Sequence, residues 1–250
     1  MSGHSHTQLS TKLIVMKNVV NRALVAKKKN RIKIVEYAPS VEDPNILVAY
    51  TANGGRIELV LCRVPEKRRT NGKLYTNGKH DFFSLTSRGL RQVFEHLAPT
   101  SRTPGRSCHN GKRGNIYPQM REYGNATCHS LVCTAFHGPR PIVNGILYVC
   151  DHKNGNIMDW SKDNLEWVSP RENTWRARHV LQVLRAKKFD LTTFNGAAMD
   201  KWFALFRALE MAGRKPKELP REELEDLFRR YRLEDPQERM EYEMTHHIEV

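Results

Sequence analysis

Long apolar runs are missing from this sequence of 250 residues. Runs such as "LIVM" and "ILYVC" fall far short of the roughly 18 residues that a membrane-spanning helix needs. The N-terminus is basic and poor in acids, as in some transit peptides, but it lacks the continuous apolar stretch of a secretory signal. We therefore expect a cytoplasmic protein that does not span a membrane.

Paired cysteine motifs are also absent. The five cysteines, Cys62, Cys108, Cys128, Cys133 and Cys150, form no CxxC pair, and their number is odd. An odd count fits reduced thiols better than a disulfide framework. Their spacings match no familiar zinc motif, so a structural zinc is not expected.

Acidic residues are scarce relative to basic ones. Asp and Glu number 27 against 41 Lys and Arg, which gives a net charge of +14. The last forty residues carry eight basic and eleven acidic residues, so the preceding 210 carry +17 (14 + 3). Such an excess attracts polyanions at long range, which favours nucleic acid as the partner and an anionic membrane surface as the second choice. We expect this binding to belong to the body of the chain.

A hydrophobic content of 39% is enough for a real core, in one large domain or two modest ones. Residues 1–30 are a basic arm, and residues 31–114 are rich in β-branched and apolar residues, with a hairpin turn at Asn53-Gly54-Gly55. We expect antiparallel sheet there, interrupted by basic loops at "TNGKLYTNGK" and "PTSRTPGRSCHNGKRGN".

The next segment alternates between strand and helix patterns. "NIYPQM" predicts a strand, and "TCHSLVCTAFHG" predicts a short helix with Leu131, Val132, Ala135 and Phe136 on one face. "GILYVCD" predicts a buried strand, and "LEWVS" a second strand with Trp167 as a large core anchor.

A helix is clearly marked after these strands. Ser169 offers an N-cap, Pro170 suits the first position, and Glu172 completes a capping box. The spacing predicts an apolar face of Ala177, Val180, Leu181 and Leu184, with basic residues, among them Arg176, on the remaining surface.

Two more helices are expected in residues 189–250. One carries the stripe Trp202, Leu205, Phe206 and Leu209, and the other the stripe Leu224, Leu227, Phe228 and Tyr231. The linker "GRKPKEL" is longer than a helix-turn-helix turn of about 3 to 4 residues, and the second helix is acidic. A docking surface for a homodimer or another protein is the favoured interpretation, and a helix-turn-helix reader is the alternative.

One short stretch, "VCDHKNGN", carries the residues for a reaction. A phosphodiester hydrolase needs a general base for water and a hard cation at the phosphate. The imidazole of His152 suits the first task near pH 7, and the oxygens of Asp151 and Asn173 suit Mg²⁺ or Mn²⁺. A bend at the "KNGN" turn would allow Asp151 and His152 to share one site, and a hairpin followed by one helical turn would bring Asn173 back to them. An isolated Asp-His pair has a simpler explanation as a hydrogen-bonded turn.

The order of four stretches narrows the choice. "CHSLVCTAFHG", "VCDHKNGN", "DNLEWVS" and "PREN", within about residues 115–178, resemble the phage and intron-encoded HNH homing endonucleases, whose pattern runs through "HRLV..AF", "DHIDGN", "NLEWVT" and "EN". Asn154 replaces the usual second acid of that pattern, and "NIMDWSKDN" replaces an asparagine-rich loop. "FFSLTSRGLRQV" is loosely similar to a module that precedes the nuclease in such enzymes.

The resemblance implies an α+β fold with a ββα-metal (His-Me finger) nuclease core at residues 115–188, between the β-rich DNA-binding region and a C-terminal helical extension. It implies His152 as general base, Asp151 and Asn173 as ligands of a single divalent metal, Mg²⁺ or Mn²⁺, and Asn164 as the residue that braces the loop and orients the histidine. His129 matches the leading histidine of "HRLV", with a structural hydrogen bond as the simpler interpretation.

The expected function is therefore a metal-dependent endonuclease acting on double-stranded DNA, of the phage homing or free-standing type, in the host cytoplasm if phage-encoded. The alternatives are a non-catalytic nucleic-acid-binding regulator on the same scaffold, and a hydrolase acting on RNA or a small molecule, although the +17 body disfavours small substrates. The expected DNA contacts are Lys27, Lys28, Lys29, Arg68, Arg69, Arg106, Lys112, Arg113, Lys153, Arg171 and Arg176.

Overall fold

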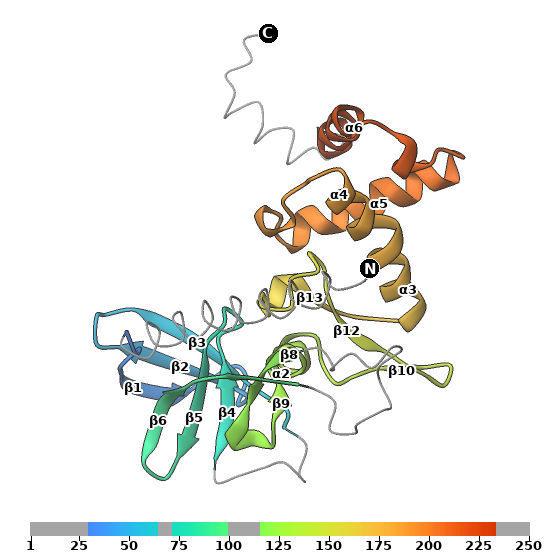
Figure 1. Cartoon of the computed structure of the whole chain (residues 1–250). Coiled ribbons are helices and arrows are strands. Elements are labelled where there is room, and N and C mark those ends of the chain that lie inside the picture. The colour runs from blue at the N-terminus through green and yellow to red at the C-terminus, as the bar shows by residue number, and fades with distance from the viewer. Residues whose placement is uncertain (1–29, 65–71, 100–115, 234–250) are drawn as a thin grey trace, which may run out of the picture. The chain divides into compact units, whose positions relative to one another are not determined.

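The computed structural model describes residues 30–64, 72–99 and 116–233. They form two compact units, and helix and strand occur together in the chain as the expected α+β class requires (Figure 1). The first unit contains the described residues up to 77, 81–98 and 119–126, and the second contains 78–80, 116–118 and 127–233. The basic arm, apart from Asn30, lies outside the described residues, and the division into four regions stays a prediction.

The first unit is built on a six-stranded antiparallel sheet in which each strand pairs with the next along the chain. Leu47, Ala49, Leu59, Tyr75 and Phe83 form its core. The strands are β1 (Ile34–Pro39), β2 (Ile46–Thr51), β3 (Arg56–Leu61), β4 (Lys73–Thr76), β5 (Phe82–Thr86) and β6 (Gly89–Val93). The antiparallel sheet and the hairpin at Asn53-Gly54-Gly55 are thus confirmed.

The expected basic loop at "TNGKLYTNGK" was wrong in part. Lys73–Thr76 forms β4, where Leu74 and Tyr75 are buried. The repeated Thr-Asn-Gly-Lys pattern concealed the short apolar pair between its two copies. A further three-stranded sheet has the order β7 (His96–Pro99), β8 (Ile116–Met120) and β9 (Ala126–Thr127), with the 3₁₀ turn η2 (Arg121–Tyr123) before its last strand. The strand expected at "NIYPQM" is β8.

The second unit begins with a helix and two hairpins. Helix α2 (Cys128–Phe136) buries Leu131 and Val132 as expected. The small hairpin of β10 (Ile142–Val143) and β11 (Ile146–Leu147) follows. Then β12 (Val149–His152) pairs antiparallel with β13 (Leu165–Val168), and the 3₁₀ turn η3 (Lys162–Asn164) precedes β13.

Two expectations for these strands were wrong. "GILYVCD" is not one buried strand, because Ile146 and Leu147 belong to the exposed β10–β11 hairpin and only the second half enters β12. Trp167 is only half-buried, and its indole Nε1 donates to the Gly138 carbonyl oxygen at 3.0 Å. The fully buried indole of this region is Trp160.

The capped helix is continuous but irregular. It comprises α3 (Pro170–Trp175), the π-helical turn η4 (Arg176–Leu181) and α4 (Gln182–Ala186). The Ser169 side chain accepts a hydrogen bond from the Glu172 amide, so the predicted N-cap is present. A π turn adds a residue per turn and rotates the apolar stripe. Val180, Leu181 and Leu184 are buried as expected, whereas Ala177 is exposed and Arg176 is buried, which corrects the predicted faces.

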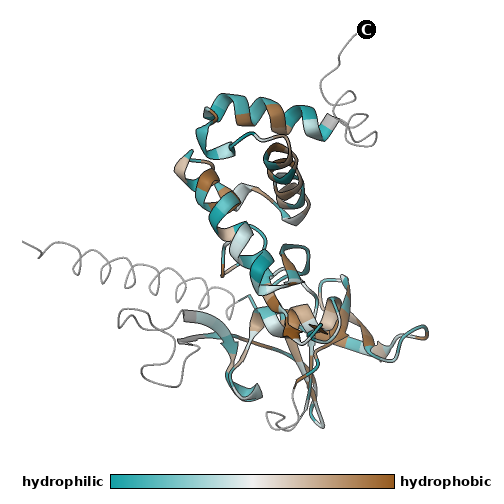
Figure 2. Ribbon diagram, turned by 90° about the vertical axis from the view of Figure 1, so that its right-hand side faces the viewer, coloured by the Kyte–Doolittle hydropathy of each residue, from teal (hydrophilic) through white to brown (hydrophobic). Residues whose placement is uncertain are grey.

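The C-terminal helices pack on α4. After the 3₁₀ turn η5 (Leu191–Thr193), α5 (Gly196–Met211), the 3₁₀ turn η6 (Pro216–Glu218) and α6 (Arg221–Leu233) follow. The rings of Trp202 and Phe228 stack at 3.9 Å between centroids and join α5 to α6. In Figure 2, α6, the helix that leads into the grey trace ending at C, is largely hydrophilic, with apolar positions confined to one stripe. Within the described part of the chain, no helix has the length and apolar content to cross a membrane.

Candidate active site

Asp151 and His152 end strand β12, and both side chains are buried, at 8% and 7% exposure. Asp151 lies opposite Glu166 and His152 opposite Leu165 in the β12–β13 pair. A turn closes directly behind them, where the Gly155 amide donates to the His152 carbonyl oxygen at 2.7 Å. Gly155 has a φ of +66°, and a side chain there would collide with Arg185 and Leu181. The strand therefore runs through both residues, and the turn lies behind the pair and not between them, so the bend expected between Asp151 and His152 is not present.

The imidazole of His152 is enclosed but not fully hydrogen-bonded. Its Nε2 atom is buried and has no hydrogen-bond partner within the described structure. Burial lowers the pKa of His152 to about 4, although the nearby Asp159 carboxylate opposes this shift. The imidazole is therefore neutral near pH 7, with one ring nitrogen able to accept a proton.

Two aromatic rings pack around this imidazole. The His129 ring, from the first turn of α2, lies edge-on to it with centroids 5.1 Å apart, and the Tyr117 ring stacks at 6.3 Å. Burial lowers the pKa of His129 to about 3, with a smaller contribution from His152. His129 Nε2 lies 3.3 Å from the Thr127 hydroxyl, a local contact of the kind expected of a structural histidine.

Asn164 connects both ends of the loop that follows His152. Its Oδ1 accepts from the Asn154 amide at 3.0 Å, and its Nδ2 donates to Asn154 Oδ1 at 3.0 Å and to the Asp159 carbonyl oxygen at 2.8 Å. The Lys153 amide also donates to the Asn164 carbonyl oxygen. At 1% exposure, Asn164 satisfies all of its side-chain polar atoms inside this loop. It fixes the backbone that leaves His152 but does not touch the imidazole in any recorded hydrogen bond.

Asp151 shares a buried arginine with two other carboxylates. Arg176 Nη1 lies 3.4 Å from Asp151 Oδ2 and 2.8 Å from Glu166 Oε2, and its Nε donates to Glu172 Oε1 at 3.0 Å. Its guanidinium also lies 4.4 Å from the centroid of the Phe203 ring on α5. Burial raises the pKa of Asp151, while the charge of Arg176 opposes that rise. The guanidinium therefore favours the ionised form of the carboxylate expected to bind metal.

Asp151 and Asn173 carry donor types suited to a single divalent ion. Asn173 precedes Arg176 by three residues, so both lie on the same helix face, and Arg176 reaches Asp151 from that face. One carboxylate and one amide oxygen are hard donors suited to Mg²⁺ or Mn²⁺, which commonly keep water and phosphate oxygens as their other ligands. Across the described ranges, no cluster of three or more His, Cys, Asp or Glu side chains is arranged to hold a metal. The Asp-Asn pair is a different donor set.

The expected DNA contacts divide into three groups. Lys27, Lys28, Lys29, Arg68, Arg69, Arg106, Lys112 and Arg113 lie outside the described residues. Arg171 is exposed at the start of α3, where a phosphate could reach it, and Lys153 makes an ion pair with Asp200 at 2.6 Å. Arg176 is buried among carboxylates, at 8% exposure, so its placement favours a structural contact over a phosphate contact.

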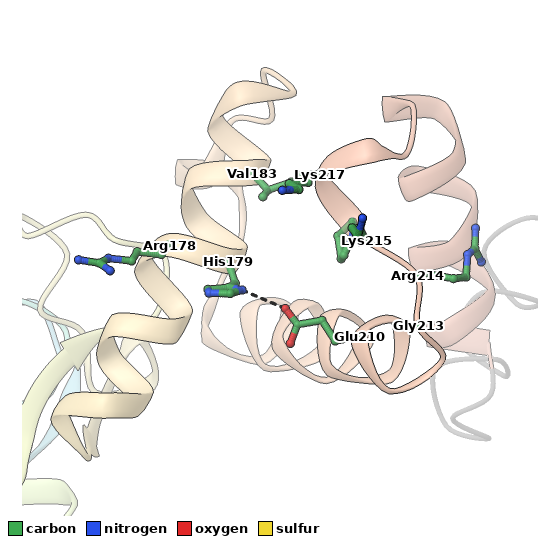
Figure 3. Close-up of a pocket in the computed structure, with 9 residues that line it drawn as sticks. Arg178, His179, Val183, Glu210, Gly213, Arg214, Lys215 and Lys217 are labelled. Carbon is green, nitrogen blue, oxygen red and sulfur yellow. Dashed lines mark hydrogen bonds and ion pairs between the residues drawn. The ribbon is translucent and has the colours of Figure 1, made fainter.

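A cavity of about 500 Å³ lies away from these residues, among the C-terminal helices (Figure 3). His179 faces Glu210 across it, with Nδ1 and Oε1 3.1 Å apart, while Arg178 and Arg214 extend away from this pair. The lining residues are Arg178, His179, Val183, Glu210, Gly213, Arg214, Lys215, Pro216 and Lys217. Neither Asp151 nor His152 lines it, so the chemistry expected of them takes place elsewhere.

Sequence reasoning missed three partners of the site. Glu166 lies opposite Asp151 in the strand register, and its acidic charge within "LEWVS" was the available signal. Asp159 receives hydrogen bonds from Asn154 and from Ser161, and Tyr117 reaches His152 from β8. No local spacing indicated the last contact, because 35 residues separate the two rings.

One of three comparisons with known proteins found a match, and it covers the segment described above. Searches of curated proteins and of solved structures found no match. A family described as HNH endonuclease matches residues 127–174, a range that contains Asp151, His152, Asn164 and Asn173. The segment that builds the candidate site is therefore similar to HNH endonucleases.

Proposed function

We propose that this protein is a divalent-metal-dependent endonuclease that hydrolyses phosphodiester bonds in double-stranded DNA. The observation that carries the proposal is the buried, unpartnered Nε2 of His152, in an imidazole that is neutral near pH 7 and that follows Asp151 in the sequence. The net charge of +14 supports a polyanionic substrate.

His152 acts as the general base in this proposal. Its Nε2 accepts a proton from water, the water oxygen attacks phosphorus, and the bond from phosphorus to the 3′ oxygen breaks. The departing 3′ oxygen takes a proton from solvent water, which leaves 3′-hydroxyl and 5′-phosphate ends as expected from the resemblance. Because the Nε2 atom is buried in the described structure, bound DNA has to open a path for water. The Tyr117 ring stacked on the imidazole is one group that covers it.

Asp151 and Asn173 would hold the ion, and Asn164 would keep the loop behind His152 in place. A bound divalent ion would neutralise charge on the phosphate and on the leaving oxygen. Arg176 favours the ionised form of Asp151 against the effect of burial, and its guanidinium is itself fixed by Glu166 and Glu172. These assignments, with a ββα-metal core formed by β12, β13 and α3, belong to the proposal.

The test is cleavage of supercoiled plasmid with Mg²⁺, with Mn²⁺ and with excess chelator, alongside labelled RNA. We expect His152→Ala to lower the rate by at least 10²-fold, because it removes the general base, while DNA binding and thermal unfolding stay close to those of the parent protein. His179→Ala, which removes an exposed histidine from the cavity among the C-terminal helices, is the matched control and should cleave normally. Full activity of His152→Ala, or of the parent protein in chelator, would refute the mechanism.

A second candidate, a non-catalytic DNA-binding regulator, has one observation in its favour. Asp151 is engaged by Arg176, a pairing that would suit a purely structural carboxylate. This candidate requires DNA binding without cleavage under every metal condition. Within the nuclease proposal, a phage homing or free-standing role is the one that we favour from the motif resemblance.

A further inference from the structure

The hairpin of β10 and β11 exposes four aliphatic side chains to solvent. Ile142, Val143, Ile146 and Leu147 are 69%, 44%, 50% and 44% exposed. Ile142 pairs with Leu147 and Val143 with Ile146, so apolar groups stand on both faces of the ribbon. Figure 1 shows the hairpin projecting from the rest of its unit. A contiguous exposed apolar patch of this kind usually marks a contact site.

The hairpin has a tight two-residue turn at its tip. Asn144 and Gly145 form the two-residue connection, and both have positive φ, +50° and +75°. That combination matches the type I′ turn, whose twist fits the strands that flank it. The tip therefore has a defined shape before it meets any partner.

The base of the hairpin is tied to the strand pair that carries the site. The Tyr148 amide donates to the Pro141 carbonyl oxygen at 3.1 Å, and Arg140 Nε donates to the Tyr148 carbonyl oxygen. Trp167 of β13 donates to Gly138, just before the hairpin. Only four residues separate Leu147 from Asp151, so the chain spans about 13 Å between them at strand geometry.

These features point to one binding partner for the hairpin, which is DNA. We propose that the β10–β11 hairpin is an apolar wedge that enters the minor groove of the DNA and unstacks a base step within about four base pairs of the scissile phosphate. This inference rests on the proposed function. Isoleucine and leucine side chains serve as such wedges in other minor-groove proteins, where unstacking produces a bend. The distance of about 13 Å corresponds to four steps of DNA rise.

A second copy of the chain fits the hairpin less well. A stable protein interface buries roughly 800 Å² on each partner, whereas two strands of two residues present only four aliphatic side chains. A wedge does not need a large area, because phosphate contacts supply most of the affinity for DNA.

The test uses the full-length protein in chelator and a duplex that contains the phosphodiester mapped in the cleavage assay. 2-Aminopurine is placed in turn at each position within six base pairs of that bond. We expect the parent protein to raise its fluorescence severalfold at one step and to bend the duplex, as measured by energy transfer between its ends. Ile142→Thr/Ile146→Thr keeps the branched shape and strand preference of both side chains but makes them polar. It should abolish the fluorescence rise and weaken binding by about threefold to tenfold.

Ile142→Val/Ile146→Val is the matched control, since valine has the shape of threonine without its hydroxyl, and it should keep the signal. Equal fluorescence and bending in the threonine and valine variants would overturn the wedge. So would a parent protein that cuts the duplex without unstacking any step, in which case the proposed function stands. A parent protein that neither binds nor cuts DNA would overturn both. A dimer that only the threonine variant dissociates, with unstacking unchanged, would assign the hairpin to a second copy instead.

Discussion

Arg176 contacts three carboxylates of the candidate site. It faces Asp151, Glu166 and Glu172, and the Phe203 ring lies over its guanidinium. Removing one partner of a buried charge set leaves the others desolvated and uncompensated. A basic residue expected to contact DNA thus holds the strand pair, the helix start and α5 together.

Arg176→Met should lower the free energy of unfolding by about 3 kcal/mol, because it retains the apolar stem and deletes only the charge. Urea unfolding measures this loss. The control is Arg207→Met, which removes an arginine that pairs with the same Glu172 but is 49% exposed, and it should cost at most about 1 kcal/mol. Similar unfolding midpoints for the two variants would show that the buried set contributes nothing special.

Asn164→Ala should cost about 2 kcal/mol, because it leaves the Asn154 amide and the Asp159 carbonyl without their buried partners. Cleavage should fall as well, through loss of order in the loop behind His152. Asn156→Ala is the comparison, since it removes a single loop bond to the Met158 amide, and should cost about 1 kcal/mol. A larger loss in Asn156→Ala than in Asn164→Ala would contradict the bracing role.

At the scale of elements, the N-terminus of α5 lies directly against the loop of the site. A Cβ atom on Gly196 would lie 1.7 Å from the Asp163 carbonyl oxygen, the residue before Asn164. Asn195 caps the same helix by accepting from the Ala198 amide. Only glycine permits this approach, so α5 and η3 form one packed junction.

Gly196→Ala tests this packing, because two effects of the substitution change the free energy of unfolding in opposite directions. Helix propensity alone predicts a gain of up to about 1 kcal/mol, but the collision with backbone should reverse the sign and cost about 3 kcal/mol. Gly213→Ala offers a contrast, because open space surrounds that position and only its φ of +70° disfavours alanine, at about 1 kcal/mol. Thermal unfolding compares them, and a stabilised Gly196→Ala protein would rule out the close packing.

The sequence predicted elements well where their causes are local. Ser169 and Pro170 marked a helix start because capping and a fixed φ act within one turn, and the stripe around Trp202 marked α5. The π turn at 176–181 was not predictable from a period of 3.6, and it moved Ala177 outward and Arg176 inward. Apolar content also predicted that Ile146 is buried, which was wrong. No local sequence feature distinguishes an exposed hairpin strand from a buried one.

In the candidate site, too, the sequence indicated residues that are close along the chain and missed contacts between distant segments. The motif identified Asp151, His152, Asn164 and Asn173, which all lie within 23 residues of one another along the chain. Contacts made by distant chain segments were missed: Tyr117 on His152 and Phe203 on Arg176. Such contacts depend on tertiary packing, for which a single sequence carries no periodic pattern.

At the scale of the whole molecule, two buried histidines make stability depend on pH. His129 and His152 titrate at about 3 and about 4 in the folded protein, and near 6.5 when unfolded. Between these values the unfolded chain binds more protons, so acid favours unfolding. Each histidine should remove roughly 2 kcal/mol of stability by pH 5, and none above about pH 7.5.

The measurement is urea unfolding at pH 7.5 and at pH 5. His129→Gln should lose about 2 kcal/mol less than the parent protein between the two values, because it removes one histidine whose pKa is lowered by burial. An identical loss in both proteins would mean that His129 is not buried as a neutral imidazole.

The helix that begins at Pro170 also limits where recombination between genes could transfer this domain intact. The family match ends at residue 174, whereas the helix continues through η4 and α4 to Ala186 and is covered by α5 and α6. A recombination point at the motif boundary would cut the helix before Arg176. The apolar face of the remaining helix would then lose the residues that cover it. A transplantable cassette from this protein has to extend at least to Phe228, the last aromatic ring stacked into that core.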